Sequence, residues 1–193
     1  RRRNFWWRKG ISLVMVKSAY SFATKKEKIE NHIIVVWVDN ETGVLARVAG
    51  LFSGRGYNID SLAVAEVDKK KNISRITIST SGTPQVLQQI KLQLAKLIPV
   101  HKVADFPANK KTLLREMALI KIVSPKTKLE KAKKLCKKYK YAVIDKTQKS
   151  YVFEISALKK EIDQLLRKLQ PLGLASVSRT GIVAMTKGSE IFK

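Results

Sequence analysis

Apolar residues recur along the chain with two different spacings, and the change from one spacing to the other outlines the elements. Residues 32–38, HIIVVWV, are β-branched or aromatic and precede the turn-forming residues Asp39 and Asn40, so we predict a strand there. Both faces of this strand are apolar, whereas a strand in a small one-layer sheet is expected to be apolar on one face only. We therefore expect an oligomer partner to cover the second face.

A helical spacing follows this strand. One stripe of an amphipathic helix is formed by Val44, Leu45, Val48, Leu51 and Phe52. Gly54 and Gly56 come after it, and Gly56 is well placed for a left-handed cap. The pattern continues as two strands joined by the polar turn DKKKN, a helix with Thr83 as cap and Pro84 as its first residue, and a last strand. These elements span residues 57–67, 73–81, 83–98 and 100–106.

The same order repeats after a polar linker at residues 107–112. A strand, a helix, a hairpin, a helix and a final strand with an extension are predicted over residues 117–123, 126–140, 141–156, 157–170 and 173–185. We therefore predict an α+β protein of two ferredoxin-like βαββαβ sandwiches, over residues 31–106 and 113–193. Each is expected to be an antiparallel sheet with both helices on one face.

The formal charge of +24 would ordinarily indicate a polyanionic partner. The excess is concentrated in the C-terminal half, where the lysines of residues 126–140 are accompanied by one aromatic residue, Tyr139, and by no series of aromatic residues on which bases could stack. A solvated helix face is therefore favoured over a polyanion site. Residues 1–26 contain no acidic residue and resemble an organelle-targeting leader, although a translated upstream extension fits equally well. We expect residues 1–30 to be poorly ordered and the protein to act in a plastid or a bacterial cytoplasm. No apolar run is long enough to span a membrane.

Few residues suit catalysis. The single cysteine, Cys136, excludes an intramolecular disulfide and fits a small buried hydrophobe better than a nucleophile. His32 and His101 are the only histidines, and we expect neither to lie near a carboxylate pair or Cys136. No metal-ligand spacing occurs. We therefore expect no catalysis, no metal and no cofactor in this chain.

Nucleic-acid binding is an alternative function, because ferredoxin-like sheets also serve as RNA platforms and the chain is basic. That mode needs exposed aromatic residues on the central strands. The segment 73–81 has none, and the segment 150–156 has only Tyr151 and Phe153. We expect neither a nucleic acid nor a membrane as partner.

The predicted helix start at Gly43 is the strongest candidate binding site. The later glycine run GLFSGRG lies at the end of the helix and matches no phosphate-binding or dinucleotide-binding motif. At the start, backbone N–H groups without helical partners and the helix dipole favour a carboxylate, and Gly43 permits close approach. The amides of Asn40 and Asn58 both donate and accept, and we expect them to flank one spot because their strands should be neighbours. Spacing alone equally allows Asn40 to be a cap and Asn58 a turn residue.

The segment DNETGVLARVAGLFSGRGYNIDSLAV, with SRITIST after it, resembles the ACT domain of the regulatory, or small, subunit of acetolactate synthase (acetohydroxyacid synthase). LREMALIKI and SRTGIVAMTKG resemble the C-terminal domain of that family. The resemblance extends from residue 32 to about residue 188. Thr42, Gly54 and Ala63 depart from the usual residues without removing an expected ligand contact, and the second domain is richer in lysine than is usual.

This resemblance implies a non-catalytic subunit that activates a separate thiamine-diphosphate-dependent catalytic subunit. Thiamine diphosphate, Mg and FAD are expected only in that partner. The resemblance further implies feedback inhibition of branched-chain amino acid biosynthesis by valine, with leucine or isoleucine as other possible effectors. The implied site lies between the ACT domains of a homodimer. The implied effector-binding residues are Asn40, Gly43, Val44, Leu45, Asn58 and Ile59. Asn40 and Gly43 would come from one chain, and Asn58 and Ile59 from its neighbour.

Overall fold

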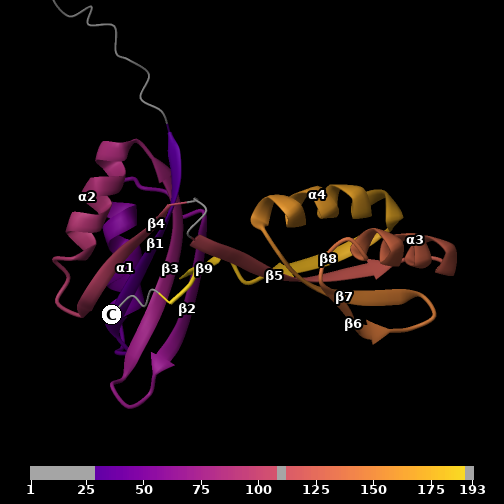
Figure 1. Ribbon diagram of the computed structural model, residues 1–193, viewed down its shortest axis with the longest axis horizontal. Helices are drawn as coiled ribbons and strands as arrows, with labels where there is room; N and C mark the ends of the chain where they lie inside the picture. The colour runs from indigo at the N-terminus through magenta and orange to yellow at the C-terminus, as the bar shows by residue number, and fades with distance from the viewer. Residues whose placement is uncertain (1–28, 108–111, 190–193) are drawn as a thin grey trace, which may run out of the picture.

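The computed structural model describes residues 29–107 and 112–189, which form two sandwiches joined through a long strand (Figure 1). The predicted leader or extension at residues 1–30 lies outside the described residues except for its last two, and only the ends of the predicted linker are described. No helix in the described ranges is long and apolar enough to cross a membrane.

The N-terminal sandwich has the predicted βαββαβ order. Its elements are β1 (Glu30–Asp39), α1 (Val44–Gly54), β2 (Ser61–Asp68), β3 (Ile73–Gly82), α2 (Pro84–Leu94) and β4 (Val100–Pro107). The sheet is antiparallel with the strand order β2-β3-β1-β4, and both helices cover the same face (Figure 1). The local signals act as predicted: the Thr83 side chain accepts a hydrogen bond from the Val86 N–H at the start of α2, and Gly56 adopts a left-handed φ of 68° after α1.

The C-terminal sandwich repeats this order and adds one strand. Its elements are β5 (Thr112–Val123), α3 (Lys126–Cys136), β6 (Tyr141–Lys146), β7 (Ser150–Ala157), α4 (Lys159–Leu169), the short 3₁₀ helix η1 (Gln170–Leu172), β8 (Leu174–Arg179) and β9 (Val183–Thr186). The main sheet has the order β6-β7-β5-β8, with α3 and α4 on one face. The prediction of an α+β protein with two ferredoxin-like sandwiches is confirmed.

The end of the chain differs from the prediction of one final strand with an extension. The chain turns at Gly181, where φ is +81°, and β9 leaves the C-terminal sheet to pair with the first four residues of β5. Strand β5 therefore pairs with β8 over residues 118–122 and with β9 over residues 112–115. In Figure 1, β9 lies beside the N-terminal sheet.

This β9–β5 ribbon corrects the interpretation of the apolar first strand. One face of β1 packs against α1 and α2, as the buried residues Ile34 and Val36 show. The other face carries Ile33 and Val35, which are buried against Ile182 and neighbouring residues of the ribbon in the same chain. The expectation that an oligomer partner covers this face is wrong, because the chain covers it with its own C-terminal strand.

Candidate effector site

The start of α1 is open to solvent. Gly43 precedes the helix with φ +85°, which glycine adopts without strain, and a Cβ built there would meet no atom within 4 Å. No side chain of the described residues caps this end, and the N–H of Val44 donates to the carbonyl of Glu41 over 3.4 Å. The helix start thus presents backbone donors and the positive end of the helix dipole to an anionic group.

Asn40 is held by its backbone and leaves its side chain exposed. Its N–H donates to the carbonyl of Asn72 at 2.7 Å, and its carbonyl accepts from Nδ2 of Asn72 at 3.2 Å. Asn72 itself has a left-handed φ of 53° in the turn before β3. The amide of Asn40 is therefore presented beside the start of α1 by a fixed backbone.

Asn58 is fixed at a different place. Its carbonyl accepts a hydrogen bond from Oγ1 of the buried Thr80 at 2.7 Å, and its Nδ2 donates to Oδ1 of Asp60 at 2.6 Å. Thr80 lies near the end of β3, and Asn58 precedes β2 at the same end of the sheet.

The expectation that the two asparagines flank one spot within a chain is wrong. Strand β3 lies between β1 and β2, so the strands that carry the asparagines are not neighbours. Asn40 bonds to Asn72 at the start of β3, whereas Asn58 bonds to Thr80 eight residues later, which is about 26 Å of extended strand. A site that contains both amides requires two chains.

The three apolar residues of the implied site differ in what they offer. Val44 is only 3% exposed and belongs to the core under α1, so only its backbone is available to a ligand. Leu45 is 42% exposed on the first turn of the helix. Ile59 is half-buried beside the same core.

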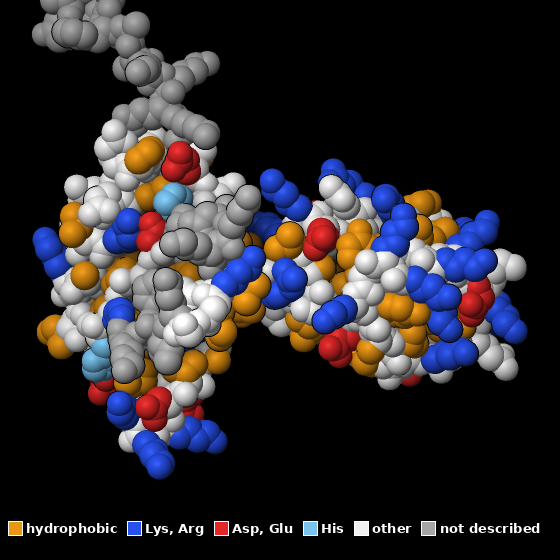
Figure 2. Space-filling model, in the orientation of Figure 1, with side chains coloured by type: hydrophobic (Ala, Val, Ile, Leu, Met, Phe, Trp, Pro, Cys, Tyr) orange, Lys and Arg blue, Asp and Glu red, His pale blue; other side chains and the backbone are white. Residues whose placement is uncertain are grey.

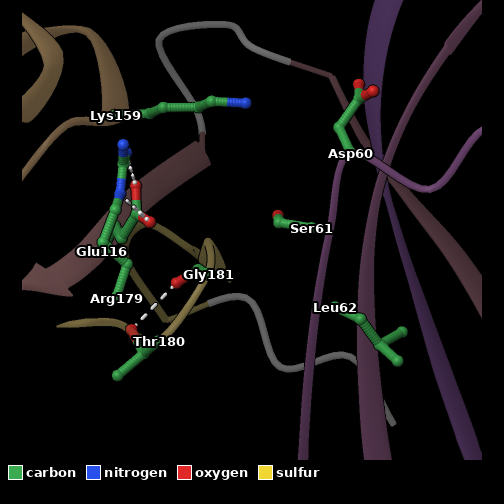
Figure 3. Close-up of a pocket in the computed structure, with 8 residues that line it drawn as sticks. All are labelled: Asp60, Ser61, Leu62, Glu116, Lys159, Arg179, Thr180 and Gly181. Atoms are coloured by element: carbon green, nitrogen blue, oxygen red, sulfur yellow. Dashed lines mark hydrogen bonds and ion pairs between the residues drawn. The ribbon is translucent and has the colours of Figure 1, made fainter. Parts of the chain in front are cut away.

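A polar cleft lies beside the Asn58 end, between the two sandwiches (Figure 3). It has a volume of about 360 Å³ and is lined by Asp60, Ser61, Leu62, Glu116, Lys159, Arg179, Thr180 and Gly181. The hydroxyl of Ser61 is buried and has no hydrogen-bond partner among the described residues. Sequence reasoning assigned no role to this cleft, although SRTGIVAMTKG, which supplies part of its wall, carried the resemblance.

Arg179 fixes one wall of the cleft. Its Nε and Nη2 donate to the two carboxylate oxygens of the buried Glu116 at 2.8 and 2.6 Å, and its Nη1 donates to Asp163 of α4 at 2.6 Å. The hydrogen bonds to Glu116, followed by those to Asp163, raise the pKa of Arg179 against the effect of burial. The end of β8 is thereby tied to both β5 and α4.

Two protein-family models together match most of the described residues. The model of the AHAS small subunit-like ACT domain matches residues 34–102, and that of the small subunit of acetolactate synthase matches residues 115–188. The acetolactate synthase small subunit of Aquifex aeolicus is 36% identical over 168 residues, which cover 86% of each chain. The chain belongs to the acetolactate synthase small subunit family.

Two further similarities agree with this assignment. The acetolactate synthase isozyme 3 small subunit of Salmonella typhimurium is 36% identical over 83% of this chain and 98% of its own. The crystal structure of the acetolactate synthase small subunit from Thermotoga maritima superposes with a TM-score of 0.76 at 31% identity, covering 83% of this chain and 99% of that one. This small subunit is therefore a regulatory ACT-domain subunit rather than the catalytic one, and it implies a catalytic large subunit as partner.

His32 of the small subunit lies near a pair of carboxylates, contrary to expectation, whereas His101 contacts one carboxylate among the described residues. Nδ1 of His32 lies 2.8 Å from Asp105 and its Nε2 lies 3.5 Å from Glu30, while Nε2 of His101 lies 2.6 Å from Asp39. The pairing of β1 with β4 brings His32 close to Asp105 and His101 close to Asp39, which the sequence spacing did not reveal. In the part of the chain that the structure describes, no group of three or more His, Cys, Asp or Glu is arranged to hold a metal ion.

Cys136 is a core residue, as predicted. It is fully buried with Leu129 and Ala132 on the inner face of α3, and burial raises the pKa of its thiol to about 12. A thiol in this environment is inert as a nucleophile at neutral pH.

The surface of the C-terminal sandwich does not provide a base-stacking platform on its central strands. Tyr151 and Phe153 of β7 are buried in the core beneath the helices. Figure 2 shows basic side chains dispersed over this sandwich, and the lysines of α3 project mainly into solvent. This arrangement favours the solvated helix face over the nucleic-acid alternative.

Proposed function

We propose that this small subunit forms a homodimer through its ACT domains and binds valine at two sites between the chains. In this proposal it activates a catalytic subunit that carries thiamine diphosphate, Mg and FAD, and bound valine reduces that activation. The observation that carries the proposal is the separation of Asn40 and Asn58 to opposite ends of β3. Each end alone supplies only half of an amino-acid site.

A twofold dimer brings these halves together. Strand β2 is an edge strand of the sheet, and it exposes Val64 and Val67, at 45% and 52%. If two copies pair side by side across this edge, the twofold axis reverses the direction of the second copy. The Gly43 end of each chain then lies against the Asn58 end of the other.

The joined halves match the groups of an aliphatic amino acid. The start of α1 offers N–H groups to a carboxylate, and the amide oxygens of Asn40 and Asn58 accept from an ammonium group. Leu45 and Ile59 supply apolar surface for a branched side chain. Valine, leucine and isoleucine share these groups, and valine is the effector implied by the family resemblance.

Valine changes activity only if it binds the inhibited arrangement more tightly than the active one. A difference of about 2 kcal/mol corresponds to an affinity ratio of about 30. Because the site joins two chains, we expect valine to stabilise one particular arrangement of the two ACT domains relative to each other.

Valine titrations of the reconstituted enzyme test the proposal. The Asn40→Ala and Gly43→Asp variants should still activate the catalytic subunit, because neither residue is buried, but their valine sensitivity should be lost. The control Gly188→Asp changes another exposed left-handed glycine and should leave inhibition unchanged. Unaltered inhibition in both site variants would sink the site assignment, and failure of the wild-type chain to bind or activate a catalytic subunit would sink the function.

A further inference from the structure

We propose that strand β9 connects the effector site to the C-terminal domain and that Arg75 is the residue that positions it. This inference rests on the proposed function, because it concerns how the bound amino acid acts. Strand β9 is paired with β5 of the C-terminal domain while its inner face lies on the ACT sheet. It is therefore placed to respond to both domains.

The Arg75 side chain holds β9 through a hydrogen bond to the backbone of that strand. From β3 its Nη2 donates to the carbonyl of Ala184, while its guanidinium lies 5.3 Å from the ring of Trp37 and 6.0 Å from that of Phe106. Burial lowers the pKa of Arg75, and its Nε is buried without a hydrogen-bond partner among the described residues. Because the guanidinium is half-buried against aromatic rings, its stability in this position depends closely on where the Ala184 carbonyl lies.

The half-site that contains Asn40 is connected to Arg75 of the same chain through β3. The backbone of Asn40 is bonded in both directions to Asn72, which immediately precedes β3. Arg75 is three residues further along and is paired with Trp37 of β1. A shift of the Asn40–Asn72 turn when a ligand binds would therefore be passed to Arg75 through three residues of hydrogen-bonded strand.

The half-site that contains Asn58 is connected to β9 of the same chain through the cleft. Asn58 bonds to Asp60, and the next residues, Ser61 and Leu62, form the ACT wall of the cleft (Figure 3). A Cβ added to Gly181, two residues before β9, would lie 3.4 Å from both the Leu62 carbonyl oxygen and the Ser61 Cβ. The backbone of the β8–β9 turn therefore lies close against the segment that carries Asn58.

The far side of this connection is anchored in the C-terminal domain. Arg179 ties the end of β8 to Glu116 and Asp163, and β9 pairs with residues 112–115 of β5. Movement of β9 relative to the ACT sheet thus requires movement of the C-terminal domain. Each chain contributes one half to each of two ligand sites, and both of its halves lead to its own four-residue strand β9. The position of that strand is therefore what ligands at both sites bias.

Hydrogen exchange of residues 181–186 in the full chain, with and without valine, tests this connection. In the wild-type chain valine should slow exchange in this segment at least about threefold. In Arg75→Met valine should still bind with a Kd within about threefold of wild type, but the change in exchange should disappear. The control Arg115→Met removes a basic side chain whose one hydrogen-bond partner among the described residues is the neighbouring Leu114 carbonyl on the same strand, and it should behave as wild type.

The reconstituted enzyme provides a second readout. Arg75→Met should raise the valine concentration for half-inhibition at least about tenfold while activation without valine persists. If Arg75→Met does not fold, Arg75→Lys, which keeps the charge but loses the planar stacking group, decides the question by the same exchange measurement. Absence of valine binding in the wild-type chain refutes the proposed function. Binding without an exchange change in residues 181–186, or an unaltered response in the folded Arg75 variant, overturns the role of β9 and Arg75.

Discussion

Gly43 and Gly50 belong to the same helical segment, yet the same substitution should have opposite effects at the two positions. Gly43 has a left-handed φ of +85° before α1, whereas Gly50 lies inside the helix, and neither would bring a Cβ within 4 Å of another atom. Gly43→Ala should lower the free energy of unfolding by about 1 kcal/mol because of backbone strain. Gly50→Ala should raise it by about 0.5–1 kcal/mol because alanine favours the helix. Urea unfolding of both variants measures the difference, and equal signs would contradict the described backbone.

Glu116 is a buried carboxylate whose charge is balanced by Arg179. Arg179→Met leaves this carboxylate without its cation, so the free energy of unfolding should fall by about 3 kcal/mol. The control Lys168→Met removes an exposed charge from the end of α4 and should change the free energy of unfolding by less than about 0.5 kcal/mol. Chemical denaturation measures both effects.

A double variant separates the ion pair from general packing. Adding Glu116→Gln to Arg179→Met removes the unpaired charge and should recover part of the lost stability. An additive loss in the double variant would show that the two side chains stabilise the domain independently.

At the scale of elements, the sequence indicated most helices and strands because their signals are local. The β-branched run of β1, the cap at Thr83 and the glycine after α1 each specify structure through neighbouring residues. The apolar second face of β1 was also recognised as a surface that needs a cover. The sequence did not reveal the cover itself, because β9 is only four residues long and its pairing with β5 depends on contacts distant in the chain.

The two faces of β9 should differ in their contribution to stability. Ile182, directly before β9, is packed against the ACT sheet, whereas Val183 is 48% exposed. Ile182→Ala should lower the free energy of unfolding by about 2 kcal/mol, because it removes apolar contacts between the domains. Val183→Ala should change it by less than about 0.5 kcal/mol. Similar losses in thermal or urea unfolding would show that the ribbon does not lie on the sheet as described.

At the scale of the whole molecule, the sequence suggests which residues could form an effector site but does not reveal how the fold arranges them. Amide chemistry and a glycine at a helix start are visible in the sequence, whereas the strand order β2-β3-β1-β4 decides which of these groups meet. Within one chain Asn40 and Asn58 are kept apart by the length of β3. The proposed effector site is therefore a property of the dimer.

Mixing two defective chains tests this central claim most directly. Gly43→Asp and Asn58→Ala should each abolish valine binding as pure homodimers, because each spoils one half of both sites. In a mixed dimer one site receives both defects and the other receives none. Random exchange of equal amounts should restore about a quarter of the wild-type valine sites, since half of the dimers are mixed and each has one intact site. Calorimetry that finds this recovery supports a site shared between chains, and calorimetry that finds no recovery after verified subunit exchange contradicts it.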